Sequence, residues 1–488
     1  MVDVVAGERL ADPGTAATRH RLAQFAGSSP VLAGVSLAGS ALGLLNKAAC
    51  RGGDWNFYLK QFQAHCYTDI YPLYFGEGLS SGKVPYTGHP VEYPVLIGAA
   101  MQAVAWLVRP VADPYTRGRE FFDLTVVLLA LCALAATLAT AHLAGRSRRW
   151  TALGVALAPG LVLASFINWD LIAVALTALG MAAWAARRHA LSGVLLGLGV
   201  ATKFYPLLFF GPLLLLCLRA GWLRAFWVTA GSAAAAWLAV NLPVAAVAPT
   251  GWLRFYQLSA SRLGDWGSIW YFFETEHWPF LGTLGRGELN ALSAGLFAGA
   301  CLLIGLLILA ARRRPRVPQV FFLVLAAFVL TNKVWSPQYV VWLVPLVVLA
   351  RPRLWPYAAW QAAEVAYFFA IWAYLITVSV AAPVAGADGG ISAGVYFAAL
   401  LGRFGAVLLL CALVIRDIVR PESDVVRGGA TGESAGVNQV GADVNQAGER
   451  RAGLGPAVRL AGEDDPAGGV LAGAQDRFVL RPRPAATI

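Results

Sequence analysis

Apolar runs of membrane-spanning length recur along this chain from about residue 30 to residue 414. A helix needs about 20 predominantly apolar residues to cross the hydrocarbon core, where every backbone hydrogen bond must be satisfied within the protein. Because 58% of the residues are hydrophobic and only 13% are charged, we predict an all-α polytopic membrane protein. The 17 Trp and 15 Tyr residues fit the aromatic belts that anchor helices at both interfaces.

The composition divides the chain into three regions. Residues 1–29 are polar and lack an early apolar core, so we expect a disordered cytoplasmic N-terminus and an uncleaved first anchor. Residues 30–415 form the predicted membrane domain. Residues 416–488 are rich in Gly, Ala and charge and contain the imperfect duplication "GVNQVGADVNQAG" at 436–448. We therefore predict a disordered cytoplasmic tail.

The basic residues indicate orientation. The formal charge is +11, but the tail carries about as many acids as arginines, so the surplus belongs to the membrane domain. The arginines cluster between apolar runs, at 146–149, 187–188, 219–224, 312–316 and 351–353. This is the positive-inside pattern and gives no indication of nucleic acid. The remaining polar segments then fall together on the outer face: 50–92, 167–170, 202–206, 250–289 and 331–339.

Two apolar segments do not fit complete spans. With residues 50–92 outside and Arg146 inside, only one crossing is allowed between them, so we expect 93–110 to be a short re-entrant or interfacial helix. The hairpin at 190–218 is too short for two full spans and is interrupted by Tyr205-Pro206. Broken helices are tolerated where they line a polar cavity, which predicts a pocket open to the outer face.

Ionisable residues in such a setting are functional candidates because inserting each costs roughly 2.5 to 3.5 kcal/mol. Lys203 and Lys333 suit a phosphate group presented from the lipid, although Lys203 could instead snorkel to the interface. Asp69 and Glu92 suit an acceptor hydroxyl that needs a base, and the aromatic residues around Asp69 would raise its pKa. A structural turn or cap is the alternative role for Asp69. Glu77, in "GEG", is expected to be solvated.

The cysteines and histidines restrict the possible disulfides and the possible functional classes. Cys132, Cys217, Cys301 and Cys411 lie in apolar runs, where they are most simply small buried hydrophobes. Cys50 and Cys66 flank the start of the first loop and would form a disulfide in an oxidising exterior, with two unrelated thiols as the alternative. The chain contains no HExxH or Walker pattern, and His65, His89 and His277 lack ligand spacing. Protease and nucleotide-driven pump functions are therefore disfavoured.

Several motifs together resemble a known family. They are "CYTDIYPLY" at 66–74, "PY" at 85–86, "EYPVL" at 92–96, "NWD" at 168–170, "GVLLGLGVATKFYPLL" at 193–208, "DWGSIWY" at 265–271 and "NKVWSPQYVVWLVP" at 332–345. Over residues 30–415 the chain resembles the bacterial polyprenyl-phosphate-mannose-dependent mannosyltransferases of glycosyltransferase family 87. It is more distantly similar to the catalytic subunit of the eukaryotic GPI mannosyltransferase that adds the first mannose.

The resemblance implies a C-type glycosyltransferase helical bundle with its active site on the outer face. It also implies a polyprenyl-phosphate sugar donor, usually mannose, a cell-envelope glycan or glycolipid acceptor, and inversion at the anomeric carbon. Asp69 matches the catalytic base and Lys203 the donor-phosphate ligand. Substrate contacts are also expected from Glu92, Asp170, Tyr205, Arg262, Asp265, Lys333 and Gln338. Some members use a histidine near the last outer loops, where "NKVWSPQY" has none.

The resemblance requires no cofactor, and a single Asp69 rather than an Asp-x-Asp pair makes a divalent metal possible but not implied. The alternatives are a lipid or solute transporter, in which Lys203 and Asp170 would contact the transported molecule, and a non-catalytic partner of a glycosylation complex. The sugar could also be arabinofuranose or glucose. The expected location is the cell membrane, crossed several times, with the active site outside.

Overall fold

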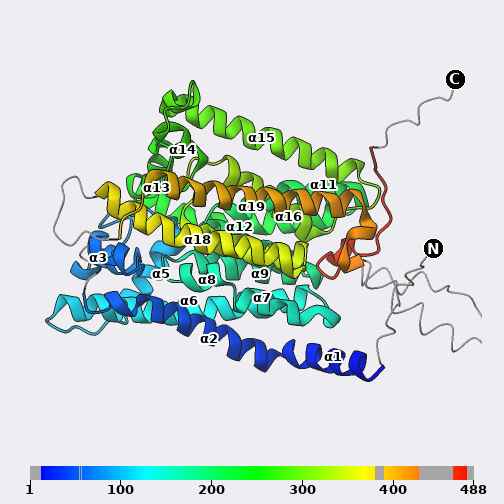
Figure 1. The fold of residues 1–488 in the computed structure, drawn as a ribbon, viewed down its shortest axis with the longest axis horizontal. Coiled ribbons are helices and arrows are strands. Elements are labelled where there is room, and N and C mark those ends of the chain that lie inside the picture. Colours follow the sequence, from blue (N-terminus) through cyan, green and yellow to red (C-terminus); the bar gives the residue numbers. More distant parts are fainter. Residues whose placement is uncertain (1–12, 54, 56–57, 380–388, 428–464, 481–488) are drawn as a thin grey trace, which may run out of the picture.

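The computed structural model describes residues 13–53, 55, 58–379, 389–427 and 465–480 of the 488. They form an all-helical bundle with no β-strand among the described residues, so the predicted fold class is confirmed. The long helices run roughly parallel to the longest axis of the molecule (Figure 1).

Within the described part of the chain, six helices are long and apolar enough to cross a membrane. The first of them continues into a short 3-10 turn, η1(Ala48–Cys50). The six are α2(Ser29–Lys47), α6(Pro114–Leu143), α12(Leu223–Val247), α15(Arg286–Ala310), α18(Leu354–Ser379) and α19(Ala393–Val419).

Shorter apolar helices lie among the long ones. They are α7(Leu153–Ala156), α8(Pro159–Ala164), α9(Asp170–Ala185), α10(His189–Thr202), η5(Tyr205–Phe209), α11(Phe210–Ala220), α16(Val317–Thr331), η7(Pro337–Tyr339) and α17(Val340–Ala350). Every residue of α17 is buried, so this helix lies in the core. Gly193 and Gly197 let α10 approach α12 closely, because a Cβ at either position would lie 2.2 Å from a carbonyl oxygen of α12.

The loops gather at two ends of the bundle. One end, called here the Asp69 end, carries α3(Tyr58–Gln63), α4(Ile70–Gly76), η3(Leu79–Ser81), α5(Val95–Ala105), α13(Pro249–Ser261), α14(Ile269–Thr275) and η6(Leu281–Thr283). The Asp69 amide donates to the Ile167 carbonyl at 2.7 Å, and the Asp265 amide donates to the Lys333 carbonyl at 2.8 Å. The predicted convergence of these distant polar segments is confirmed.

The opposite end, called here the Arg-rich end, carries α1(Pro13–Ala26), η4(Arg146–Ala152), η8(Pro421–Ser423) and η10(Gly469–Leu471). The helix α5 lies at the Asp69 end, near α3 (Figure 1). Its 11 residues span about 16 Å at 1.5 Å per residue, roughly half of the hydrocarbon thickness. The segment therefore does not cross the bundle, as the charge pattern required.

Parts of both termini are ordered, unlike the predicted disordered regions. Residues 13–26 are helical, and residues 416–427 and 465–480 pack on the Arg-rich end. The physical reason is that buried arginines need partners, and the tail supplies its acids to them. Asp424 pairs with buried Arg316 at 2.8 Å, and Asp417 pairs with Arg351. The duplication at 436–448 lies outside the described residues.

Candidate active site

The Asp69 carboxylate lies in the loop between α3 and α4, directly before the first residue of α4. It does not cap that helix. Instead it accepts hydrogen bonds from the Tyr67 hydroxyl at 2.6 Å and the Tyr93 hydroxyl at 3.4 Å. The residue remains partly exposed, and the two hydrogen bonds hold its carboxylate in position.

The two tyrosines are themselves fixed by aromatic neighbours. The Tyr67 ring stacks on Trp372 of α18, with centroids 4.4 Å apart and planes 22° apart. The Tyr93 ring meets Trp169 edge-on at 5.4 Å. Helices from both halves of the chain therefore orient the donors around Asp69.

Opposing effects set the pKa of Asp69. Burial raises this pKa above its usual value, whereas the Tyr67 hydrogen bond and the charge of Lys203 lower it. Burial is the largest effect, so the net direction is upward. A carboxylate with a raised pKa is a stronger base than an ordinary one and suits proton abstraction near neutral pH.

Asp170 and Lys203 form an ion pair beside this carboxylate. The Lys203 Nζ lies 2.9 Å from Oδ1 of Asp170, and the Trp342 indole donates to Oδ2 at 3.0 Å. Asp170 is 1% exposed and is the first residue of α9, where the helix dipole favours a negative charge. Asp170 thus positions Lys203 and has little surface of its own for a substrate.

Tyr93 connects this ion pair to Asp69. The Lys203 Nζ lies 5.0 Å from the centroid of the Tyr93 ring, within cation–π range, while the hydroxyl of the same tyrosine donates to Asp69. A cation and a candidate base thus share one aromatic neighbour, so a molecule contacting one lies close to the other.

The Lys333 ammonium is occupied by protein acceptors. Its Nζ donates to the carbonyls of Ala260 at 3.1 Å and Arg262 at 2.7 Å, and to the Asn290 side chain at 2.5 Å. Three acceptors use all three N–H donors of a lysine. Lys333 therefore fixes the 260–265 loop, and this arrangement leaves it no donor for the phosphate contact expected from the sequence.

Arg262 and Asp265 lie together on that loop. Arg262 is exposed, and its charge lowers the pKa of Asp265, although burial is the larger effect and raises that pKa overall. The Ser336 hydroxyl donates to Asp265 at 3.3 Å. Arg262 is thus the exposed cation of this loop, and it was one of the substrate contacts expected from the sequence.

Tyr205 and Gln338, expected from the sequence to contact the substrate, are almost completely buried. Tyr205 is 3% exposed and stacks on Trp342 with centroids 4.8 Å apart. Tyr339 stacks on the same indole at 3.7 Å, so the two tyrosines support the tryptophan that holds Asp170. Gln338 is 9% exposed.

Glu77 is buried, contrary to the solvated position expected for it. It is 3% exposed, accepts from the Glu92 amide at 3.4 Å, and lies 3.4 Å from the His89 ring. Burial raises the pKa of Glu77 to about 7. The reason is that the loop folds back at 86–94, which a solvated "GEG" turn does not predict. The Glu92 side chain is half-exposed and lies 3.7 Å from Arg254.

Cys50 and Cys66 are bonded to each other, with Cα atoms 6.2 Å apart. The Trp55 indole donates to the Cys66 carbonyl at 2.9 Å within the closed ring. Since Cys66 directly precedes Tyr67, the bond restrains the segment that carries the shortest hydrogen bond to Asp69.

Replacing both cysteines is expected to destabilise the protein. Removing a crosslink across 16 residues should cost roughly 3 kcal/mol in the chain-entropy model. Thermal unfolding of Cys50→Ser/Cys66→Ser in detergent should show a clear loss in Tm, whereas Cys132→Ser, outside the loop, should not. An unchanged Tm for the double variant would contradict a stabilising role.

Sequence reasoning did not select Tyr67, Tyr93, Trp342 or Lys47. The first three stand inside motifs that drew attention, but aromatic residues near an interface are usually anchors. Lys47 is fully buried at the end of α2 and donates to the Tyr67 carbonyl at 2.8 Å. The sequence could have indicated Lys47, because placing a lysine in an apolar run costs free energy and marks the residue as a structural or functional candidate.

No group of three potential metal ligands occurs among the described residues. The site thus consists of a tyrosine-bound carboxylate, a nearby lysine–aspartate pair and an exposed arginine on a neighbouring loop. Such an arrangement can take a proton from a hydroxyl and can hold an anion beside it.

The model of glycosyltransferase family 87 matches residues 93–337, about half of the chain. The match includes Tyr93, Asp170, Lys203 and Lys333, and it excludes Asp69 and both bonded cysteines. A search of curated proteins finds no significant match to the chain.

Proposed function

This chain belongs to glycosyltransferase family 87, and we propose that it transfers a mannosyl residue from a polyprenyl-phosphate donor to a cell-envelope glycan or glycolipid. The observation that carries the proposal is the partly exposed Asp69, held by two tyrosine hydroxyls, next to the Lys203–Asp170 pair. A lipid-linked donor suits a site built at one end of a membrane bundle, and its phosphate needs a cation.

In the proposed reaction Asp69 takes the proton of an acceptor hydroxyl. The acceptor oxygen forms a bond to C1 of the donor sugar from the face opposite the phosphate, and the bond between C1 and the phosphate oxygen breaks. The bonding electrons leave with the phosphate, which departs as polyprenyl phosphate, and the configuration at C1 inverts. Lys203 stabilises the growing negative charge, with Arg262 as the second cation.

The chemistry requires neither a nucleotide nor a cofactor, because the donor already carries a phosphate leaving group. A divalent metal remains compatible with the donor phosphate, but no metal step is part of the proposal. Glu92 and Arg254 lie at the same end and suit acceptor hydroxyls.

We also propose that the Asp69 end faces the outside of the cell. The arginine clusters lie at the other end, and positively charged loops favour the cytoplasmic side. A disulfide beside Asp69 fits an oxidising compartment.

The decisive test is donor use by the purified protein in lipid vesicles. Polyprenyl-phosphate mannose, glucose and arabinofuranose are each supplied with a radiolabelled sugar, and nucleotide-linked mannose serves as the control. We expect label transfer from the polyprenyl-phosphate mannose alone, with inversion in the product. Transfer from the nucleotide sugar would contradict the proposed polyprenyl-phosphate donor. Transfer of glucose or arabinofuranose from its polyprenyl phosphate would contradict only the proposal that the sugar is mannose.

Tyr67→Phe should change the pH dependence of this reaction. The substitution removes the 2.6 Å hydrogen bond, which lowers the pKa of Asp69, so that pKa rises further. A base must be deprotonated, so activity is lost first at low pH, and the acid limb of kcat/KM should move up by about one pH unit.

Tyr93→Phe serves as the graded comparison, because its hydrogen bond to Asp69 is longer at 3.4 Å. Its shift in the kcat/KM profile should have the same direction and a smaller size. Identical profiles for wild type and Tyr67→Phe would show that Asp69 does not control the acid limb.

A further inference from the structure

We infer that the Arg-rich end carries a peptide-binding groove whose resident ligand is residues 465–480 of the same chain. This segment, shown in red at the end opposite α3 in Figure 1, lies outside the family match. Its Ala467, Val470 and Leu471 are buried against the bundle. The groove is independent of the reaction proposed at Asp69.

Asp476 provides the main charge contact of the segment. Its two carboxylate oxygens lie 2.7 Å from Arg219 and 2.5 Å from Arg314. The Arg219 guanidinium is fully buried and also donates to the carbonyls of Ile308 at 2.6 Å and Ala311 at 2.8 Å. Because the bundle itself orients Arg219, the receptor for Asp476 is formed by the helices and not by the segment.

The segment also satisfies backbone groups at helix ends. The last carbonyls of a helix lack partners within it. The amides of Arg477 and Phe478 donate to the Arg219 carbonyl in the last turn of α11 at 2.7 and 3.2 Å, and the Leu480 amide donates to the Leu309 carbonyl in the last turn of α15 at 2.9 Å. The peptide thus caps two helices that are distant in sequence.

Arg314 and Trp184 donate hydrogen bonds to backbone carbonyls of the segment. Arg314 donates to the carbonyls of Leu471 at 2.6 Å and Ala474 at 2.8 Å, and the Trp184 indole donates to the Gly468 carbonyl at 3.0 Å. Gly469 has φ +61°, and a Cβ there would lie 2.3 Å from the Trp184 carbonyl oxygen. The groove therefore requires glycine at this position.

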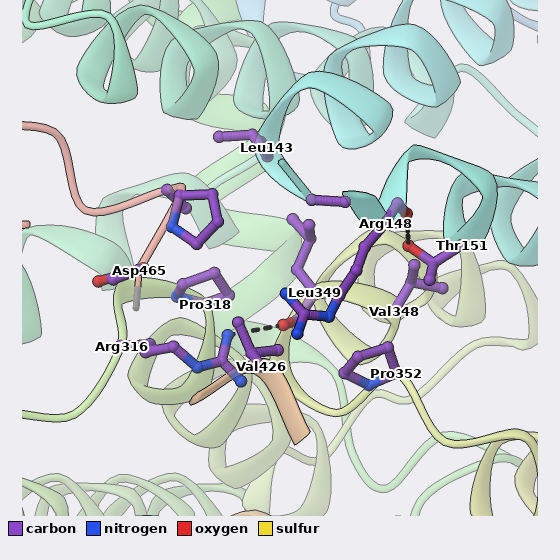
Figure 2. Close-up of a pocket in the computed structure, with 13 residues that line it drawn as sticks. Leu143, Arg148, Thr151, Arg316, Pro318, Val348, Leu349, Pro352, Val426 and Asp465 are labelled. Carbon is purple, nitrogen blue, oxygen red and sulfur yellow. Dashed lines mark hydrogen bonds between the residues drawn. The ribbon is translucent and has the colours of Figure 1, made fainter. Parts of the chain in front are cut away.

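The segment enters the groove next to the end of α19. Val426 and Asp465 line one small pocket together with Arg148 and Arg316 (Figure 2). Val426 and Asp465 therefore lie near each other at the Arg-rich end. The peptide is recognised by its own contacts, so it should stay bound after the chain is cut.

The test uses the full-length protein with a protease site placed within residues 428–464 and a fluorescent label at the C-terminus. After cleavage, the labelled fragment should co-elute with the membrane domain, and an excess of synthetic peptide 465–480 should displace it. Fragments carrying Asp476→Asn or Gly469→Ala should dissociate at least about tenfold faster. Gln475→Ala, an exposed neighbour, is the matched control and should dissociate like the wild type.

Two results would overturn the inference. One is a wild-type fragment that separates as quickly as the Asp476→Asn fragment after cleavage. The other is a wild-type fragment that stays bound while neither Asp476→Asn nor Gly469→Ala changes its release, because the contacts described would then not hold it. Sugar transfer need not be active for either readout, so failure here is distinct from failure of the proposed reaction.

Discussion

Asp69→Asn is expected to reduce turnover by about 10² to 10⁴-fold, the usual range for loss of a general base. The asparagine keeps the shape of the side chain, and its carbonyl oxygen can still accept from Tyr67, which donates to Asp69 at 2.6 Å. It cannot take a proton from the acceptor hydroxyl. Because the substitution removes only this step, binding of the donor lipid should remain nearly unchanged.

The measurement compares kcat for sugar transfer with donor affinity, determined separately by equilibrium binding in vesicles. Asp113→Asn is the matched control, since this exposed N-cap carboxylate lies at the same end and asparagine caps a helix equally well. Full turnover by Asp69→Asn would remove Asp69 as the base and make Glu92 the next residue to test.

Much of the fold follows from the sequence because the membrane allows few alternatives. Hydrophobic length predicted the helices, and the arginine clusters predicted which loops meet at each end. The short helix α5 followed from counting crossings. The docking of residues 465–480 could not be predicted, because their composition resembles that of a disordered segment. Their contacts depend on Arg219 and Arg314, which lie 257 and 162 residues from Asp476 in the sequence.

The site was harder to predict than the fold. Asp69 and Lys203 could be selected as candidates because charges are rare in an apolar chain. The difference between the two lysines could not be predicted, because it depends on geometry. Three oxygen acceptors take up the donors of Lys333, whereas Lys203 pairs with Asp170 alone among the acids that the structure describes. The roles of Tyr67 and Tyr93 likewise depend on hydroxyl positions that no periodicity specifies.

Lys203→Ala is expected to weaken donor binding as well as turnover, in contrast to Asp69→Asn. The donor phosphate is charged both in the bound substrate and in the transition state, so its cation contributes to both. Loss of a charged contact worth about 1.5 to 3 kcal/mol should lower donor affinity by roughly 10 to 150-fold. Lys83→Ala, an exposed lysine of the first loop, should leave affinity unchanged.

Asp170 is only 1% exposed. Lys203→Ala alone therefore leaves a buried carboxylate without its cation, and this destabilises the fold. The double variant Lys203→Ala/Asp170→Asn separates the two effects, because it removes both charges and relieves the uncompensated carboxylate. We expect the double variant to recover the Tm lost by Lys203→Ala while its donor affinity stays low. Recovery of donor affinity together with Tm would show that Lys203 serves only to neutralise Asp170, and the phosphate site would then lie at Arg262.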